Sequence, residues 1–319
     1  MAIPKRDSDP MSSEKHRIVL LDGGMGQELR RRSDRPATPL WSAQVMLDEP
    51  QLVTAVHRDF IDAGARIITT NNYSATPQRL ARDGDPAMFA PLQAAALNAA
   101  RQAREESGQA VRIAGCLPPL VASYHHEVVP DDATCLRDYR RLVQVQADGV
   151  DLFICETMTL AREALAATRA AVEHGIPVWV AFTVDDSDGT RLRSGEPLAE
   201  AARSVVAAGA EAVLVNCSVP EAVTTATEAL ADLGVPFGGY ANGFTAAADL
   251  APGGTVEALE TRQDLDPEGY AEHACRWIEQ GATIVGGCCE VSPAHIAALA
   301  ERLTAGGYRL VSSLEPADA

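Results

Sequence analysis

Three cysteines have the residue type and the placement expected of a metal site. Cys217 ends one apolar run (VLVNC), and Cys288 with Cys289 ends another (IVGGCC). Three thiolates suit zinc, a borderline-soft ion, and they leave one of its four tetrahedral positions open, as in catalytic rather than structural zinc sites. We therefore predict a catalytic zinc site in which a substrate takes the fourth position.

We predict neither a disulfide between Cys288 and Cys289 nor a functional role for the other four cysteines. A disulfide between the sequence neighbours Cys288 and Cys289 would be strained and would need an oxidising compartment. Cysteine is also a small residue that is often simply buried. Burial alone is the prediction for the remaining four cysteines, Cys116, Cys135, Cys155 and Cys275.

The composition argues against several classes of partner. The chain has 319 residues, 46% of them hydrophobic, which is enough for one large core. A net charge of −17 and a sequence pI near 4.8 argue against nucleic-acid binding, which depends on Lys and Arg. The sequence has no apolar run of membrane-spanning length and no apolar signal segment, so we predict no membrane partner and a cytoplasmic location. The expected partners are small molecules, and the sequence specifies no oligomeric state.

Eight short runs of apolar or β-branched residues alternate with longer stretches of helical period. The runs are residues 18–21, 66–70, 111–114, 151–155, 177–183, 212–215, 236–240 and 283–285. This alternation indicates βα units and a parallel sheet. Eight units favour a single α/β domain, a (β/α)8 TIM barrel over residues 17–308, with a flexible leader at 1–16 and a tail at 309–319. An open doubly wound sheet is the alternative architecture.

The segments that follow the expected strands differ from those that precede them. The segments that follow are dense in Gly, Pro, Asn, Cys and acids, as in DGGMG, NNYSAT and GGCCEVSP. The segments that precede are plainer, and four carry a glycine suited to ending a helix, namely Gly64, Gly175, Gly209 and Gly281. Because the loops after the strands of an α/β barrel build its active site, we expect the chemistry at the carboxyl ends of the strands.

Four motifs placed after the expected strands resemble those of the homocysteine S-methyltransferase family, which comprises zinc-dependent thiol and selenol methyltransferases. They are Asp22-Gly23-Gly24, Glu156-Thr157, Asn216-Cys217 and Gly286-Gly287-Cys288-Cys289, and the resemblance spans roughly residues 18–302. The resemblance implies an eight-stranded barrel whose zinc is held by the cysteines at 217, 288 and 289. It also implies that Asp22 and Glu156 hold the amino-acid end of homocysteine.

The same acids have simpler interpretations when the residues are considered alone. Asp22 could stabilise the turn with its two following glycines, and Glu156 could cap the next helix. Three further polar residues, Thr70, Asn71 and Asn242, lie where the expected fold would face a substrate pocket, and we count them as candidate substrate-binding residues.

The predicted reaction is methyl transfer from a sulfonium donor, S-methylmethionine or S-adenosylmethionine, to the thiolate of homocysteine, giving methionine. A betaine-type donor, or another thiol or selenol acceptor, is an alternative, because the segment YANGF and Gln27 depart from the family pattern. A metal-assisted aldolase or lyase would instead bind Mg²⁺ or Mn²⁺ through acids such as Asp22, Glu156 and Asp185. A zinc-binding module without turnover would need a fourth protein ligand that closes the site.

Overall fold

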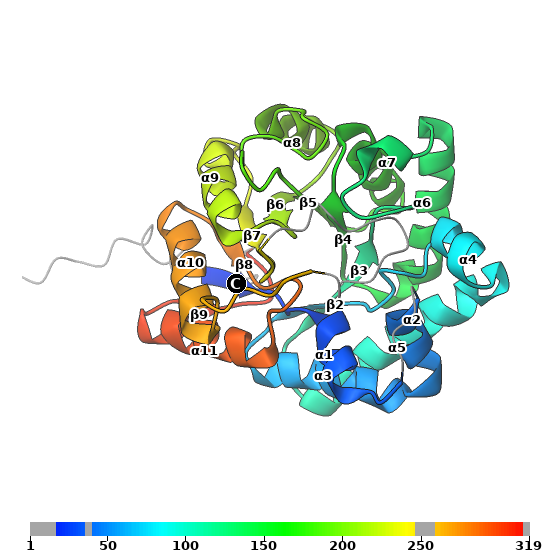
Figure 1. Cartoon of the computed structure of the whole chain (residues 1–319), viewed down its shortest axis with the longest axis horizontal. Helices are drawn as coiled ribbons and strands as arrows, with labels where there is room; N and C mark the ends of the chain where they lie inside the picture. The colour runs from blue at the N-terminus through cyan, green and yellow to red at the C-terminus, as the bar shows by residue number, and fades with distance from the viewer. Residues whose placement is uncertain (1–16, 36–39, 246–258, 315–319) are drawn as a thin grey trace, which may run out of the picture.

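The computed structural model describes residues 17–35, 40–245 and 259–314, and these form one curled parallel sheet surrounded by helices (Figure 1). In sheet order, the strands of this part of the chain are β2 (Ile67–Thr69), β3 (Arg112–Leu117), β4 (Leu152–Met158), β5 (Val178–Phe182), β6 (Ala212–Asn216), β7 (Phe237–Tyr240), β8 (Ile284–Val285), β1 (Arg17–Leu20) and β9 (Arg309–Leu310). All eight runs that the sequence marked as strands are strands.

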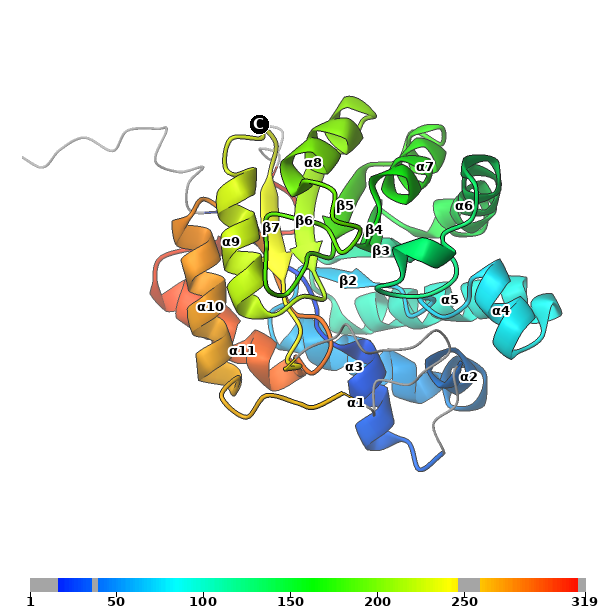
Figure 2. The ribbon, with the colours of Figure 1, turned by 45° about the horizontal axis from the view of Figure 1, so that its top comes forward.

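The helices lie on the outside of the sheet, as the turned view also shows (Figure 2). They are α1 (Met25–Arg32), α2 (Trp41–Asp48), α3 (Pro50–Asp62), α4 (Pro77–Asp83), α5 (Phe89–Ser107), α6 (Asp132–Gln146), α7 (Ala161–Val172), α8 (Leu198–Ala207), α9 (Pro220–Leu230), α10 (Pro267–Glu279) and α11 (Pro293–Ala305). The four predicted helix-ending glycines all have positive φ, between +69° and +114°. No helix among the described residues is long and apolar enough to cross a membrane.

The two ends of the eight-strand run approach each other. β1 pairs in parallel with β8, and an isolated parallel bridge joins Leu21, just past β1, to Ile67 of β2. The amide of Arg66 also donates to the carbonyl of Leu20 at 2.7 Å. The predicted α/β class with a curled parallel sheet is therefore confirmed. β9, which lies in the segment predicted to be a tail, pairs with the other edge of β1, and the predicted leader lies outside the described residues.

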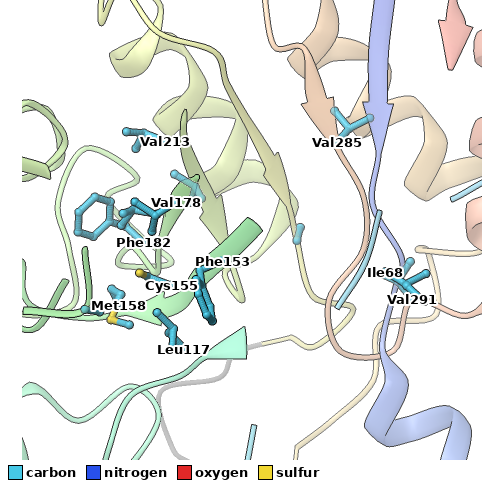
Figure 3. Packing of buried hydrophobic residues seen from close by; sticks show 14 of the residues in the cluster. Ile68, Leu117, Phe153, Cys155, Met158, Val178, Phe182, Val213, Val285 and Val291 are labelled. Atoms are coloured by element: carbon cyan, nitrogen blue, oxygen red, sulfur yellow. The ribbon is translucent and has the colours of Figure 1, made fainter. Parts of the chain in front are cut away.

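Side chains along each strand alternate between two apolar layers. One layer faces the helices, and Figure 3 labels members of it, among them Phe153, Val178, Phe182 and Val213. The other layer fills the inside of the curled sheet with Val19, Leu21, Ile67, Ala114, Leu152, Ile154, Trp179, Ala181, Ala212, Leu214, Tyr240 and Ile284. Since strand side chains alternate with a period of two, Glu156 continues the inner face of β4 after Leu152 and Ile154. The sequence of β4 thus directs a carboxylate to the interior.

Candidate active site

A cavity of about 510 Å³ opens at the carboxyl ends of the strands. Its lining includes Asp22 after β1, Thr70 after β2, Glu156 of β4, Cys217 after β6 and Cys288 after β8. These residues are far apart in the sequence and meet because parallel strands end at the same edge. The chemistry-bearing loops predicted to follow the strands therefore share one cavity.

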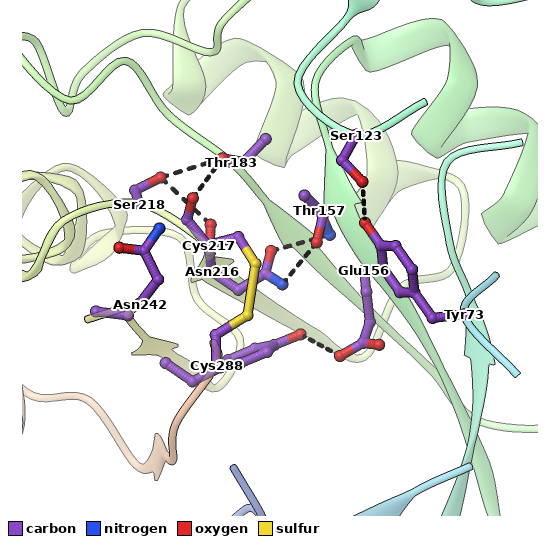
Figure 4. The surroundings of a disulfide bond; sticks show 12 residues. Tyr73, Ser123, Glu156, Thr157, Thr183, Asn216, Cys217, Ser218, Asn242 and Cys288 are labelled. Atoms are coloured by element: carbon purple, nitrogen blue, oxygen red, sulfur yellow. Dashed lines mark hydrogen bonds between the residues drawn. A yellow bond between two sulfur atoms is a disulfide. The ribbon is translucent and has the colours of Figure 1, made fainter. Parts of the chain in front are cut away.

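The structure brings together the three cysteines that the sequence singled out. The sulfur atoms of Cys217, Cys288 and Cys289 lie within 4.8 Å of one another, and no other such group of possible metal ligands occurs among the described residues. Cys217 and Cys288 are joined as a disulfide (Figure 4), a pairing that the sequence did not suggest. A disulfide and a three-thiolate metal site would use the same sulfur atoms, so they are alternative states of one cluster.

The remaining thiol, that of Cys289, has no cation from the described residues among the groups that shift its pKa. Burial raises the pKa of the Cys289 thiol to about 11, so this sulfur is protonated at neutral pH. A bound metal ion reverses that tendency, because a coordinating thiol is deprotonated. The cluster has the soft donor atoms and the number of ligands that fit zinc.

Two buried carboxylates lie in the same cavity as the thiols. Asp22 accepts hydrogen bonds from the amide of Thr69 at 2.8 Å and from its hydroxyl at 3.4 Å. Glu156 accepts a hydrogen bond from the hydroxyl of Tyr240 at 3.0 Å and one from the thiol of Cys116 at 3.1 Å. Because β7 is separated from β4 by two strands, the Tyr240–Glu156 contact crosses the inside of the curled sheet.

Neither carboxylate forms an ion pair with a residue that the structure describes. Burial raises the pKa of Asp22 to about 8, and the nearby charge of Glu156 adds to the shift. Burial likewise raises the pKa of Glu156. Buried acids without a cationic partner are costly to ionise, and a substrate ammonium group would supply the missing positive charge.

Backbone strain in the described chain is concentrated around this cavity. The non-glycine residues with positive φ are Tyr124 (68°), Thr157 (57°), Cys217 (51°) and Glu290 (66°), and each of them lines the cavity. Such conformations cost about 1–3 kcal/mol each and persist only where the surroundings enforce them. Their clustering marks the cavity as a functional site.

Asn216 is one of the groups that enforce these conformations. Its side-chain oxygen accepts a hydrogen bond from the amide of Thr157 at 2.9 Å, and its side-chain nitrogen donates to the hydroxyl of Thr157 at 3.0 Å (Figure 4). This residue thus links the end of strand β4, which carries Glu156, to the turn that carries Cys217. The sequence placed Asn216 in a motif without assigning it this supporting role.

The candidate polar residues divide into two groups. Thr70 and Asn71 line the cavity, and the side-chain nitrogen of Asn71 donates to the carbonyl of Ser42 at 2.9 Å. Asn242 is completely buried and is not part of the cavity lining, and its side-chain oxygen accepts from the amide of Phe244 at 3.1 Å. Tyr240 was not among the predicted site residues, although the two-residue alternation of β7 directs its side chain to the inside of the sheet.

The acids proposed for an aldolase-type metal site do not assemble in the described chain. Asp185 is absent from the cavity lining, and its carboxylate accepts hydrogen bonds from Ser187 and Asp188 within its own loop. The thiol cluster is the group of possible metal ligands present in this part of the chain. The geometry therefore favours a soft metal over Mg²⁺ or Mn²⁺.

Comparison with known proteins agrees with this site. A family model described as homocysteine S-methyltransferase matches residues 19–303. The chain is 34% identical to homocysteine S-methyltransferase of Escherichia coli (strain K12), over 91% of this chain and 96% of that one. It is 30% identical to a selenocysteine methyltransferase of Astragalus bisulcatus, over 91% and 94% of the two chains.

Solved structures give the same result. The metallated form of the homocysteine methyltransferase MmuM from Escherichia coli matches with a TM-score of 0.76 and 30% identity, over 89% of this chain and 96% of that one. The oxidized form of MmuM matches with a TM-score of 0.75 and 29% identity, over 92% and 100%. With the motifs, the fold and the thiol cluster in agreement, the chain is an enzyme of the homocysteine S-methyltransferase family.

Proposed function

We propose that this enzyme uses zinc to transfer a methyl group from a sulfonium donor, S-methylmethionine or S-adenosylmethionine, to the sulfur of homocysteine. Its family supports methylation of a thiol or selenol. The observation that carries the more specific proposal is the presence of three clustered cysteine sulfur atoms and two uncompensated carboxylates in one cavity. The thiol side suits a metal-bound acceptor sulfur, and the carboxylate side suits the ammonium group of an amino acid.

Cys217, Cys288 and Cys289 would hold the zinc, which would lower the pKa of the acceptor thiol so that it is a nucleophilic thiolate at neutral pH. The reaction then needs no side chain as a general base. Two hydrogen bonds between Asn216 and Thr157 hold the residue before Cys217 in place, which favours a preorganised position for that ligand. A reaction without a side-chain general base agrees with the absence of a histidine from the cavity lining in the described chain.

Asp22 and Glu156 would bind the ammonium group of homocysteine. Tyr240 and Cys116 donate to Glu156 and leave its remaining acceptor capacity for the substrate. Asp22 must lose its proton to act as a full counter-charge, and an ammonium group nearby would lower its pKa and favour that loss. Substrate binding is therefore expected to release a proton when it occurs below about pH 8.

The methyl transfer is a direct displacement. The acceptor sulfur forms a bond to the methyl carbon while the bond from that carbon to the donor's sulfonium sulfur breaks. The breaking electron pair stays on the donor sulfur, which leaves as a neutral thioether. The rings of Tyr73 and Tyr124 line the cavity and could contact a cationic methyl group. The main task of the protein is to hold the two substrates in line at near-attack distance.

We also propose that the sheet is a complete eight-stranded barrel. The bridge between Leu21 and Ile67 and the hydrogen bond from the amide of Asp22 to the carbonyl of Ile67, at 3.1 Å, support closure between β1 and β2. Closure explains why residues after β1, β4, β6 and β8 can meet in one cavity.

The decisive experiment measures metal content and methionine formation in reduced wild-type protein and in Cys288→Ala. Homocysteine is supplied with S-methylmethionine, S-adenosylmethionine or betaine in separate assays, and selenocysteine replaces homocysteine in a parallel set. Zinc together with sulfonium-dependent methionine, both lost in the variant, would support the proposal. Turnover with betaine alone would identify betaine as the donor in place of a sulfonium. Turnover with selenocysteine alone would identify a selenol as the acceptor. Full activity in zinc-free protein would refute the mechanism.

A further inference from the structure

The loop between β5 and α8 contains a partly buried ion pair that the reaction described above does not use. Arg193 and Asp186 lie 3.0 Å apart, and their side chains are 7% and 19% exposed. Two residues away, Arg191 and Asp188 form a pair with side chains 54% and 47% exposed. An exposed pair contributes little to stability, whereas a buried one is costly unless its groups make further hydrogen bonds. The partly buried pair makes such bonds to the turn that carries Cys217.

The pair contacts the backbone at Cys217 and two residues after it. Arg193 donates to the carbonyl of Cys217 at 3.4 Å and to the hydroxyl of Thr183 at 3.0 Å, and that hydroxyl donates to the same carbonyl at 3.2 Å. Asp186 accepts a hydrogen bond from the amide of Val219 at 3.0 Å. Figure 4 shows Thr183 beside Cys217 and Ser218. Since Cys217 has a φ of +51°, these bonds hold a residue in a conformation that it would rarely adopt alone.

The same guanidinium supports a second residue next to the thiols. The guanidinium carbon of Arg193 lies 4.9 Å from the centre of the Tyr124 ring, within the range of a cation–π contact. Tyr124 forms a small apolar cluster with Cys217, Cys288 and Cys289. Tyr124 also has a positive φ, of 68°. Arg193 therefore contacts both the turn that carries Cys217 and the aromatic residue that shares an apolar cluster with the three cysteines.

We propose that Arg193, held by Asp186, is a positioning residue that preorganises the thiol cluster for metal binding. This inference rests on the proposed zinc-dependent function. The planar guanidinium donates in several fixed directions at once, to Asp186, Thr183 and Cys217, which a lysine ammonium cannot reproduce in the same geometry. Its positive charge also offsets part of the negative charge that three thiolates bring to the site.

The test compares metal affinity in reduced protein by competition with a chelator, using Zn²⁺ and Co²⁺. Arg193→Met keeps an aliphatic stem but removes the charge and the donors, Asp186→Asn removes the charge that holds Arg193, and Arg191→Met is the matched control in the same loop. We expect Arg193→Met and Asp186→Asn to weaken metal binding by about 10–100-fold, as is usual when a group that orients a metal ligand is lost. Arg191→Met should bind metal as the wild type does.

A second readout separates positioning from general stability. With cobalt bound, the thiolate-to-cobalt absorption bands should shift or weaken in Arg193→Met, at a temperature where circular dichroism shows the variant folded. If that variant does not fold, Arg193→Lys replaces it, with a smaller loss of affinity expected because the charge remains. Wild-type affinity and an unchanged cobalt spectrum in a folded Arg193 variant would overturn the inference, as would an equal loss in Arg191→Met. Wild-type protein that binds no metal would refute the proposed function and this inference together.

Discussion

The two sides of the cavity differ in the chemistry of their side chains and in how those side chains are supported. On the sulfur side, Cys217, Cys288 and Cys289 are soft donors in one apolar cluster with Tyr124. On the carboxylate side, the buried Asp22 and the partly buried Glu156 are hard acids whose hydrogen-bond donors are neutral. Each side therefore has unneutralised donor groups that a different kind of cation would satisfy. The sulfur side suits a metal ion, and the carboxylate side suits an ammonium group, so one zwitterionic thiol could satisfy both.

The largest expected effect comes from removing a thiol. Cys217→Ser or Cys288→Ala should lose metal and activity by more than the ~10–100-fold typical of changing a group that only supports a metal ligand. Metal analysis and methionine assays on the same preparations measure both losses. Cys275→Ala, which alters a cysteine outside the cavity lining, is the control and should leave both properties unchanged. Full activity in the Cys217 variant would contradict a metal role for the sulfur side.

Neutralising the carboxylate side should weaken acceptor binding while sparing the metal. Glu156→Gln removes a charge that would pair with an ammonium group, and charged hydrogen bonds contribute about 1.5–3 kcal/mol, so KM for homocysteine should rise roughly 10–150-fold. Steady-state kinetics and metal content check the prediction. Loss of metal from this variant would show that the two sides do not act separately.

The raised pKa of Asp22 predicts a pH-dependent cost to stability. The pKa is about 8 in the folded protein against an ordinary value of 3.8, so the unfolded chain loses this proton first as the pH rises. Between those values the free energy of unfolding should fall by up to about 1.4 kcal/mol per pH unit because of this one group. Asp22→Asn removes that dependence.

Chemical denaturation at pH 5 and pH 8, on substrate-free protein, measures the difference. Asp22→Asn should be more stable than wild type at both values, and the advantage should be larger at pH 8. The same variant should bind homocysteine more weakly, so it gains stability at the expense of function. An equal stability difference at the two pH values would show that the pKa of Asp22 is not raised.

The smallest expected effect concerns the support of Glu156. Tyr240→Phe removes the hydroxyl that donates to this carboxylate at 3.0 Å and keeps the buried ring. Because Tyr240 supports the carboxylate, only part of this bond's free energy, about 0.5–1.5 kcal/mol, should appear in acceptor binding, so KM for homocysteine should rise roughly 2–12-fold with little change in kcat. Steady-state kinetics at a fixed donor concentration would measure this rise in KM. A larger fall in kcat than in affinity would assign Tyr240 a more direct role in the reaction.

The strands and the position of the site could be predicted from the sequence because both depend on local patterns. Apolar runs located every strand of the described chain except β9, and the contrast between GGCCEVSP after a strand and IEQGA before one showed which edge holds the chemistry. Strand order then brought Cys217 and Cys288 to the same cavity. These features follow from periodicity and from the geometry of parallel strands.

Contacts made by loops across the cavity could not be predicted in the same way. The Cys217–Cys288 pairing, the buried position of Asn242 and the contact of Arg193 with Tyr124 depend on how separate loops pack, which no local pattern encodes. The acidic loop after β5 gave no sign in its sequence that Asp186 would turn inward while Asp185 stays within its own turn. Tertiary packing decides such orientations.

The most direct test of the two-sided account counts the sulfur ligands of the bound metal by X-ray absorption spectroscopy, with and without homocysteine. The account predicts three sulfur ligands from the protein and a fourth when homocysteine is added, in wild type and, at higher homocysteine concentration, in Glu156→Gln. A sulfur count that does not change when homocysteine is bound would contradict the claim that the substrate's thiol joins the three cysteines.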